Sequence, residues 1–339
     1  MKAILVGMGG RAQSWIGVCD RVRKSGTDVD LVGFVEPVDD QRTKVAEKFS
    51  IGKDRLFSSL TVAVAGTEAD FVIDVTPPAV HEAVALEAFD AGLHVIGEKP
   101  LSDDFAAAKR IVDASESAGK THMITQNYRF GNVPRTTRRL LAEDRIGTPE
   151  QVVVGFQKTW AHNPGSHYTT MAHPLLTDMG IHHFDLMRYV LACEPVSASC
   201  TIWNPSWGWH AGEASHVLYV EFEGGLHVIH HAFGSSVGRQ SPWNGDWHID
   251  GPEGSISWED DHLFVTRNHP PDQKAREEIP VDELPHLGQD ACLVEFLAAI
   301  TEGREPECSG RDNLKSLALT FAAVQSAVEK RPVQISELL

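Results

Sequence analysis

The chain has 339 residues, of which 42% are hydrophobic and 23% are charged. This composition is typical of a folded globular protein of about two domains, and it excludes a disordered, collagenous or coiled-coil chain. Thirty basic residues against 47 acidic ones give a net charge of −17 without any basic stripe, so neither nucleic acid nor an anionic membrane surface is an expected partner.

The first third of the chain alternates short apolar runs with amphipathic stretches. Strands are expected at residues 3–6, 31–35, 71–75, 94–96 and 123–125, with helices such as 80–91 and 105–118 between them. Near-continuous apolar strands separated by helices indicate a parallel sheet that is covered on both faces. Residues 1–125 are therefore predicted to form an α/β domain with a doubly wound Rossmann sheet.

Residues 126–339 are predicted to form an α+β domain with a large, mostly antiparallel open sheet. Several strands follow one another through short turns, without helices between them. Strands are expected at 151–159, 196–203, 215–223, 226–233, 247–250, 254–258 and 262–267, and helices at 177–191, 291–301 and 313–329. The polar, proline-rich stretch 269–285 is expected to be a surface excursion.

The five cysteines are scattered and form no CxxC pair, which predicts reduced thiols. The apolar run at the N-terminus is too short for a signal peptide, and no run approaches the ~18 residues that a membrane span needs. We therefore expect a cytoplasmic protein with no membrane partner.

The first chemical motif is a glycine loop directly after the first strand. Gly7, Gly9, Gly10, Arg11 and Ala12 lie in a G-x-G-x-x-A pattern. Gly7 permits a tight turn, Gly9 lets the backbone approach a pyrophosphate, and Ala12 lets the following helix pack closely on the strand. The pattern predicts a dinucleotide site.

Glu36 ends the second strand, 24 positions after Ala12, where an acid can bind the diol of a ribose. A carboxylate at this place repels a 2′-phosphate, which favours NAD over NADP. NADP stays possible, because Arg11 and Arg42 could bind that phosphate. The competing interpretation of Glu36 is a solvated acid at the end of a strand.

Lys99 follows Glu98 at the end of the strand expected over 94–96, and it precedes Pro100. Ligands of open α/β sheets lie beyond the carboxyl ends of the strands, so Lys99 is expected beside the nicotinamide. Pro100 restricts Lys99 to an extended backbone and allows a cis peptide bond. The alternative is an ordinary surface lysine.

A third motif lies on the helix expected over 177–191. Asp178, His182 and Asp185 are spaced i, i+4 and i+7, and so share one helix face. A carboxylate one turn from an imidazole stabilises the imidazolium, which predicts His182 as a general acid/base and Asp178 as its partner. Gly180 suggests a close approach by backbone or ligand. Three alternatives stay open, namely a helix cap for Asp178, a core role for His182, and a metal bound by all three.

The order of these motifs resembles the glucose–fructose oxidoreductase / inositol dehydrogenase / MocA family. Residues 76–78 (TPP) with His81, residues 126–130 (QNYRF), and the segments 243–247 and 250–254 add to the likeness, which covers nearly the whole chain. The resemblance implies hydride transfer between NAD(P) and a secondary hydroxyl of a sugar, sugar derivative or inositol. It also implies a homodimer or homotetramer formed through the open sheet.

The resemblance further implies roles for individual residues. Lys99, Asp178 and His182 match the catalytic positions, and no metal is implied. Besides the glycine loop and Glu36, the expected cofactor-binding residues are Thr76, Pro77, His81, Glu98, Lys99 and Asn127. Arg129 matches the junction of cofactor and substrate. The segment 171–176 (MAHPLL) replaces the glycine-rich run of many members, so a particular substrate cannot be transferred from any of them.

Aromatic and histidine side chains crowd the second domain, and indole faces stack on pyranose rings. Trp160, His162 and Trp243 are therefore expected to bind the substrate with Lys99, Arg129, Asp178 and His182. Lys99 and His182 are 83 positions apart, and we expect them to converge beside the nicotinamide. Other functions remain, namely a glycosidase or lyase that retains NAD, a non-catalytic NAD- or sugar-binding protein, and a zinc-dependent route through the histidines.

Overall fold

The computed structural model describes residues 1–163, 165–267 and 275–339. The chain divides into two compact units. The first unit contains Met1–Asn127 and His286–Leu314, and the second contains Tyr128–Pro285 and Lys315–Leu339. This division differs from the two consecutive segments expected from the sequence, because residues 286–314 return to the first unit.

The first unit contains a six-stranded parallel sheet in the order β3-β2-β1-β4-β5-β6. Ala3, Ile4 and Leu5 of β1 and Phe71, Val72 and Ile73 of β4 are all fully buried, as expected for strands covered on both faces. The strands are β1 (Lys2–Val6), β2 (Asp30–Val35), β3 (Leu56–Phe57), β4 (Phe71–Asp74), β5 (His94–Gly97) and β6 (His122–Ile124).

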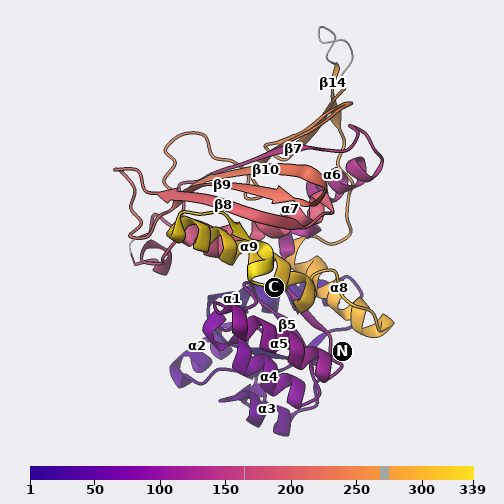
Figure 1. The fold of residues 1–339 in the computed structure, drawn as a ribbon. Helices are drawn as coiled ribbons and strands as arrows, with labels where there is room; N and C mark the ends of the chain where they lie inside the picture. Colours follow the sequence, from indigo (N-terminus) through magenta and orange to yellow (C-terminus); the bar gives the residue numbers. More distant parts are fainter. Residues whose placement is uncertain (164, 268–274) are drawn as a thin grey trace. The chain divides into compact units, whose positions relative to one another are not determined.

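Six helices accompany this sheet, and Figure 1 shows the first five in indigo to magenta. They are α1 (Gly10–Lys24), α2 (Asp39–Phe49), α3 (Leu60–Gly66), α4 (His81–Asp90), α5 (Phe105–Ser117) and α8 (Gly288–Glu302). The strand order reverses between β1 and β4, and ligands of such sheets bind beyond the carboxyl ends of these strands. The doubly wound sheet expected from the sequence is confirmed.

Helix α8 explains why residues 286–314 belong to the first unit. Arg21 of α1 donates two hydrogen bonds to Asp290 at 2.6–2.7 Å, and the ring of Phe296 packs edge-on against Phe71 of β4 at 5.3 Å. Ile124 of β6 donates a backbone hydrogen bond to Cys308. These contacts join residues far apart in the sequence, so local patterns did not reveal them.

The second unit contains a nine-stranded sheet in the order β14-β13-β12-β11-β7-β10-β9-β8-β15. Only the pair β7 and β10 is parallel, which confirms a mostly antiparallel mixed sheet. Its strands are β7 (Gln151–Gln157), β8 (Pro195–Trp203), β9 (Ser215–Phe222), β10 (Leu226–Phe233), β11 (Asp246–Gly251), β12 (Gly254–Glu259), β13 (His262–Arg267), β14 (Ala275–Ile279) and β15 (Val333–Gln334).

Burial alternates along the central strands, so the sheet has one covered and one open face. In β10, Leu226, Val228 and His230 are buried, whereas His227 and Ile229 are exposed. The helices of this unit are α6 (Asn132–Ala142), α7 (Gly180–Leu191) and, from Lys315 onward, α9 (Gly310–Glu329), which Figure 1 labels. Residues 180–190 of α7 are all buried, which makes α7 the central helix of the unit.

Several local details differ from the expectations. The helix expected over 177–191 begins as a π-helical turn, Leu175–Met179, and becomes α-helical only at Gly180. Strand β14 falls within the stretch expected to be an irregular excursion, because Ala275–Ile279 pairs with β13; residues 269–274 of that stretch lie outside the described residues. Short 3₁₀ turns occur at Lys53–Arg55, Pro78–Val80, Asn127–Phe130, His167–Thr169, Glu223–Gly225 and Ile335–Glu337.

None of the five cysteines forms a disulfide, and Cys19, Cys292 and Cys308 are buried. Burial raises the pKa of Cys19 to about 12, which keeps this thiol protonated. A search of the described helices for a long apolar segment that could cross a bilayer finds none.

Candidate active site

The glycine loop has the geometry that its pattern predicts. Gly7 has φ +93°, and a Cβ placed on it would lie 3.2 Å from backbone atoms of Val75 and Thr76. A Cβ on Gly9 or Gly10 would meet no atom within 4 Å. Helix α1 begins at Gly10 without a capping side chain, so its first N–H groups are available to an anion. Open space before a helix N-terminus fits a pyrophosphate.

Glu36 lies at the end of β2 and is folded back toward this loop. Its carboxylate accepts hydrogen bonds from the backbone N–H groups of Met8 at 3.0 Å and Val38 at 3.1 Å. The residue is only 9% exposed, so it is not the solvated acid of the competing interpretation. Arg42 donates to the carbonyl of Glu36 and to the carboxylate of Asp39. The guanidinium of Arg42 is therefore already bound within the protein. Of the two arginines expected to be able to bind a 2′-phosphate, this leaves Arg11.

A second group of candidates follows β4. Thr76 donates from its backbone N–H and its hydroxyl to the buried carboxylate of Asp74, at 3.0 and 2.6 Å. Burial raises the pKa of Asp74, and the nearby His81 and Thr76 oppose that rise. The two ring nitrogens of His81 face the carbonyls of Thr76 at 2.9 Å and Pro100 at 3.0 Å. His81 thus joins two loops at the carboxyl edge of the sheet.

Glu98 and Lys99 follow β5, and the Lys99–Pro100 peptide bond is cis. The carboxylate of Glu98 accepts hydrogen bonds from the indole of Trp15 at 2.9 Å and from the side-chain amide of Gln289 at 2.8 Å. Glu98 therefore holds α1 and α8 against β5. Lys99 is 8% exposed, so the interpretation as an ordinary surface lysine is wrong.

The predicted acid/base of the second unit lies at the start of α7. His182 is 6% exposed, and its imidazole stacks on the ring of Tyr128 at 4.4 Å with an interplanar angle of 13°. Asp178 is half-buried and lies within the π-helical turn, without an N-cap role. A Cβ on Gly180 would lie 2.8 Å from the carbonyl of Leu175, so the close backbone approach that Gly180 suggested is present.

Arg129 and Asp185 have a different arrangement from the one expected. The guanidinium of Arg129 donates two hydrogen bonds of 2.6 Å to the two oxygens of Asp185, and both side chains are buried. Asp185 also accepts a hydrogen bond from Ser316 at 2.8 Å. The structure therefore places the carboxylate of Asp185 in an internal ion pair.

The expected aromatic residues fall into two classes. Trp160 is buried within an apolar cluster that also contains Phe156, Leu175, Met179, Ala214 and Ala232, and Tyr128 packs against it. His162 is exposed and contacts the ring of Trp209 at 4.4 Å. Trp243 is 50% exposed, and the ammonium of Lys158 lies 4.9 Å from its ring centre. Trp243 is thus the accessible one of the two indoles predicted to bind the substrate.

Three buried histidines, which the sequence motifs did not reveal as a group, fix the backbone at Trp243. His183 donates from Nε2 to the carbonyl of Trp243 at 2.8 Å, so its Nδ1 accepts from His230 Nε2 at 3.0 Å. His230 Nδ1 in turn accepts from His216 Nε2 at 2.9 Å. Burial lowers the pKa of His183 to about 4 and that of His216 to about 3, which keeps these rings neutral.

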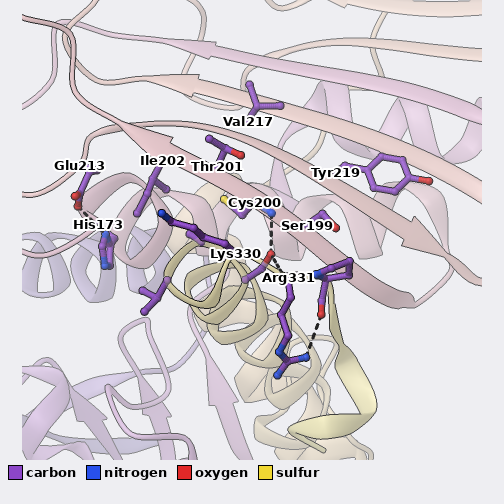
Figure 2. Close-up of a pocket in the computed structure, with 14 residues that line it drawn as sticks. His173, Ser199, Cys200, Thr201, Ile202, Glu213, Val217, Tyr219, Lys330 and Arg331 are labelled. Carbon is purple, nitrogen blue, oxygen red and sulfur yellow. Dashed lines mark hydrogen bonds and ion pairs between the residues drawn. The ribbon is translucent and has the colours of Figure 1, made fainter.

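Within residues 1–163, 165–267 and 275–339, no group of three or more His, Cys, Asp or Glu side chains could hold a metal ion. A cavity of 820 Å³ lies along β8, β9 and the C-terminal end of α9, and none of its lining residues is a predicted site residue. Figure 2 shows His173 and Glu213 paired at one end of this cavity, with a contact of 3.0 Å. The backbone N–H of Cys200 donates to Ser326 along the same edge.

Two family models match consecutive parts of the chain, one in each unit. Residues 1–126 match a model described as "Oxidoreductase family, NAD-binding Rossmann fold", and residues 134–257 match the "GFO/IDH/MocA C-terminal domain". The first unit is therefore an NAD-binding Rossmann domain. Its open glycine loop and Glu36 are the features that fit this cofactor.

Individual relatives cover most of the chain. D-apiose dehydrogenase from Paraburkholderia graminis is 27% identical over 310 residues, covering 88% of this chain and 82% of that protein. Inositol 2-dehydrogenase from Corynebacterium glutamicum is 25% identical over 276 residues, covering 79% and 80% respectively. Among solved structures, an oxidoreductase from Agrobacterium radiobacter in complex with NAD+, L-tartaric acid and magnesium has a TM-score of 0.86 at 22% identity, covering 100% and 99%.

Proposed function

Because the chain belongs to the GFO/IDH/MocA family of NAD-binding oxidoreductases, we propose that it transfers a hydride between NAD and a secondary hydroxyl of a sugar, sugar derivative or inositol. The observation that carries this proposal is the buried imidazole of His182, stacked on Tyr128 with Asp178 one turn before it. Oxidation of an alcohol needs a group that takes the hydroxyl proton, and a positioned histidine is suited to it near neutral pH.

Each catalytic residue has a separate task in this proposal. His182 takes the proton of the substrate hydroxyl, and Asp178 stabilises the imidazolium that results. The ammonium of Lys99 stabilises negative charge as it develops on the same oxygen. NAD, when bound, accepts the hydride from the substrate carbon. In the reverse direction, His182 returns the proton to the oxygen of the reduced product.

We propose NAD as the preferred cofactor, with NADP as the alternative. Glu36 supports NAD because its buried carboxylate, held beside the glycine loop by Met8 and Val38, would repel a 2′-phosphate. Arg42 is bound to Glu36 and Asp39, which leaves only Arg11 of the two expected arginines to favour NADP.

We also propose that the open face of the nine-stranded sheet forms a homodimer or homotetramer. Val153, Val217 and Ile229 are 40%, 40% and 44% exposed, and they lie on the adjacent strands β7, β9 and β10. Apolar side chains on one sheet face are typical of a protein interface. Sedimentation velocity measures the assembly.

We propose a reducing, cytoplasmic location, which is supported by the five cysteines because none of them forms a disulfide.

The test of the activity is a panel of polyols, namely myo-inositol, D-apiose, levoglucosan and D-glucose, supplied separately with NAD and with NADP. Growth of absorbance at 340 nm with NAD is the expected result. Product formation without accumulation of NADH would instead identify a lyase or glycosidase that retains NAD. Binding without any product would identify a non-catalytic protein, and either result would refute the proposed dehydrogenase.

A further inference from the structure

The loop between β8 and β9 holds a histidine that none of the motifs includes. His210 lies in this loop, which Asn204 ties together by donating to the carbonyls of His210 at 3.2 Å and Gly212 at 2.9 Å. Asn204 also accepts a hydrogen bond of 2.8 Å from the backbone of Ala214. Ala211 donates to the carbonyl of Thr169 at 2.8 Å. The backbone around His210 is therefore fixed on both sides.

The ring of His210 lies beside the indoles of Trp160 and Trp209. It stacks on Trp160, with 5.7 Å between the ring centres and an interplanar angle of 20°, and it contacts Trp209 at 5.5 Å. Trp209 donates its indole N–H to the carbonyl of Trp160 at 2.9 Å. His210 itself is 6% exposed, yet neither Nδ1 nor Nε2 has a hydrogen-bond partner among the described residues.

Two unpartnered nitrogens on one buried ring are unfavourable in the free protein, since each polar atom has lost water without gaining a partner. Burial lowers the pKa of His210, so the ring is neutral and has one donor and one acceptor. A carboxylate can pair only with the donor, and an ammonium only with the acceptor. Alcohol hydroxyls both accept and donate, so they match both nitrogens.

The position of His210 connects it to the predicted acid/base. Trp160, on which His210 stacks, belongs to the buried cluster against which Tyr128 packs, and Tyr128 stacks on His182. All of these residues lie in the second unit. His210 and His182 are thus linked through the rings of Trp160 and Tyr128 within this unit, and the proposal below assigns them to different hydroxyls of one substrate.

We propose that His210 is a substrate-binding residue, whose two ring nitrogens bind hydroxyl groups of the polyol other than the one that is oxidised. The proposal rests on the proposed function, because it takes the polyol as the ligand. Entry of the polyol requires a shift of side chains that cover the ring. Trp209 contacts the ring of His210 and is partly exposed, so its indole is the side chain that we propose to move.

The substitution His210→Phe tests this proposal, because it keeps an aromatic ring and removes both nitrogens. Without ligand, the variant should melt at a higher temperature than the wild type, since two unpaired polar atoms are gone. With NADH bound, its affinity for the polyols of the panel should fall about tenfold, as expected for the loss of one or two neutral hydrogen bonds. KM should rise by the same factor while kcat stays within about threefold.

Two further variants complete the design. His210→Gln keeps a donor and an acceptor, and should recover part of the affinity. His167→Phe changes an exposed imidazole that contacts Tyr168 at 3.9 Å, and should alter neither the melting temperature nor the affinity. Affinity is measured by tryptophan fluorescence, which also reports a shift of Trp209.

The outcomes separate this proposal from the dehydrogenase activity. A lower melting temperature of the ligand-free His210→Phe protein would show that a buried water or another group already satisfies the ring, and would overturn the proposal. Unchanged polyol affinity would also overturn it, even if the enzyme turns over. A polyol that binds through His210 but is never oxidised would refute the dehydrogenase and leave the His210 site intact.

Discussion

Replacement of Arg129 by methionine should destabilise the second unit instead of acting on substrate binding. Its guanidinium and the carboxylate of Asp185 are buried and joined by two hydrogen bonds of 2.6 Å. Removing one partner leaves the other charge buried and unpaired, which costs about 3–5 kcal/mol of unfolding free energy. Asp185→Leu should cause a loss of similar size.

The double variant Arg129→Met/Asp185→Leu should recover most of this stability. It removes both charges and fills the site with apolar side chains, an exchange that is often neutral or stabilising. One cost remains, because Ser316 loses the carboxylate to which it donates at 2.8 Å. That loss is about 1–3 kcal/mol if the hydroxyl finds no other acceptor. The two single losses are therefore strongly non-additive.

Urea unfolding followed by tryptophan fluorescence measures the effect, because seven of the eight tryptophans lie in the second unit. With a slope of about 2 kcal/mol per molar urea, a loss of 3–5 kcal/mol moves the midpoint down by roughly 1.5–2.5 M. Arg139→Met is the matched control, because Arg139 forms a two-bond pair with Asp282 that is about 40% exposed on both sides. Its midpoint should move by less than about 0.5 M.

The refuting result is a stable Arg129→Met protein with weakened polyol affinity. In that case Arg129 would contact the substrate, as the family resemblance implies, and the ion pair with Asp185 would contribute little to folding.

Three further predictions concern catalysis, the cofactor and pH. Lys99→Ala and His182→Ala should each lower kcat by about 10²–10⁴-fold while NADH binding, followed by fluorescence, stays unchanged; near-normal turnover would contradict the assigned roles. Glu36→Ala should weaken the affinity for NAD about tenfold or more, and it should reduce the ratio of the affinities for NAD and NADP. If that ratio stays unchanged, Glu36 is not the residue that causes the preference for NAD. The pKa values of about 4 for His183 and about 3 for His216 lie below the pKa of a histidine in the unfolded chain. Below pH 6.5 the unfolded chain therefore binds more protons at these two residues than the folded protein does. The free energy of unfolding falls as a result when the pH drops. At pH 5 each group should account for a loss of about 2 kcal/mol relative to pH 7.5, and a urea midpoint that does not fall over this range would contradict their burial as neutral rings.

Much of the first unit could be predicted because its signals are local. The apolar strands β1, β2, β4, β5 and β6 each follow a helix or the chain start, and the glycine loop is continuous in the sequence. Strand β3 was missed because Leu56–Phe57 is too short to form a pattern. Strand β14 was missed because its sequence AREEI lacks apolar alternation, and only pairing with β13 makes it a strand.

Candidate site residues could be proposed from the sequence only where they form motifs. Lys99 and His182 are candidates because of E-K-P and D-x-G-x-H-x-x-D, and both side chains are buried. The partner of Arg129 is 56 positions away, and the helix face that seemed to unite Asp178 with Asp185 was interrupted by a π-helical turn. His210 had no sequence signal at all, since its loop has no periodicity and its significance depends on what its ring nitrogens fail to contact.

The return of residues 286–314 to the first unit has a consequence for synthesis of the chain. Glu98 receives one of its two hydrogen bonds from Gln289, and Phe71 packs on Phe296, so both partners leave the ribosome long after the strands they complete. The cofactor-binding unit must therefore wait, partly uncovered, until residues 286–314 have been made. For the same reason, a fragment ending near residue 125 would expose this apolar surface, and an isolated version of the unit needs residues 286–314 attached through a linker.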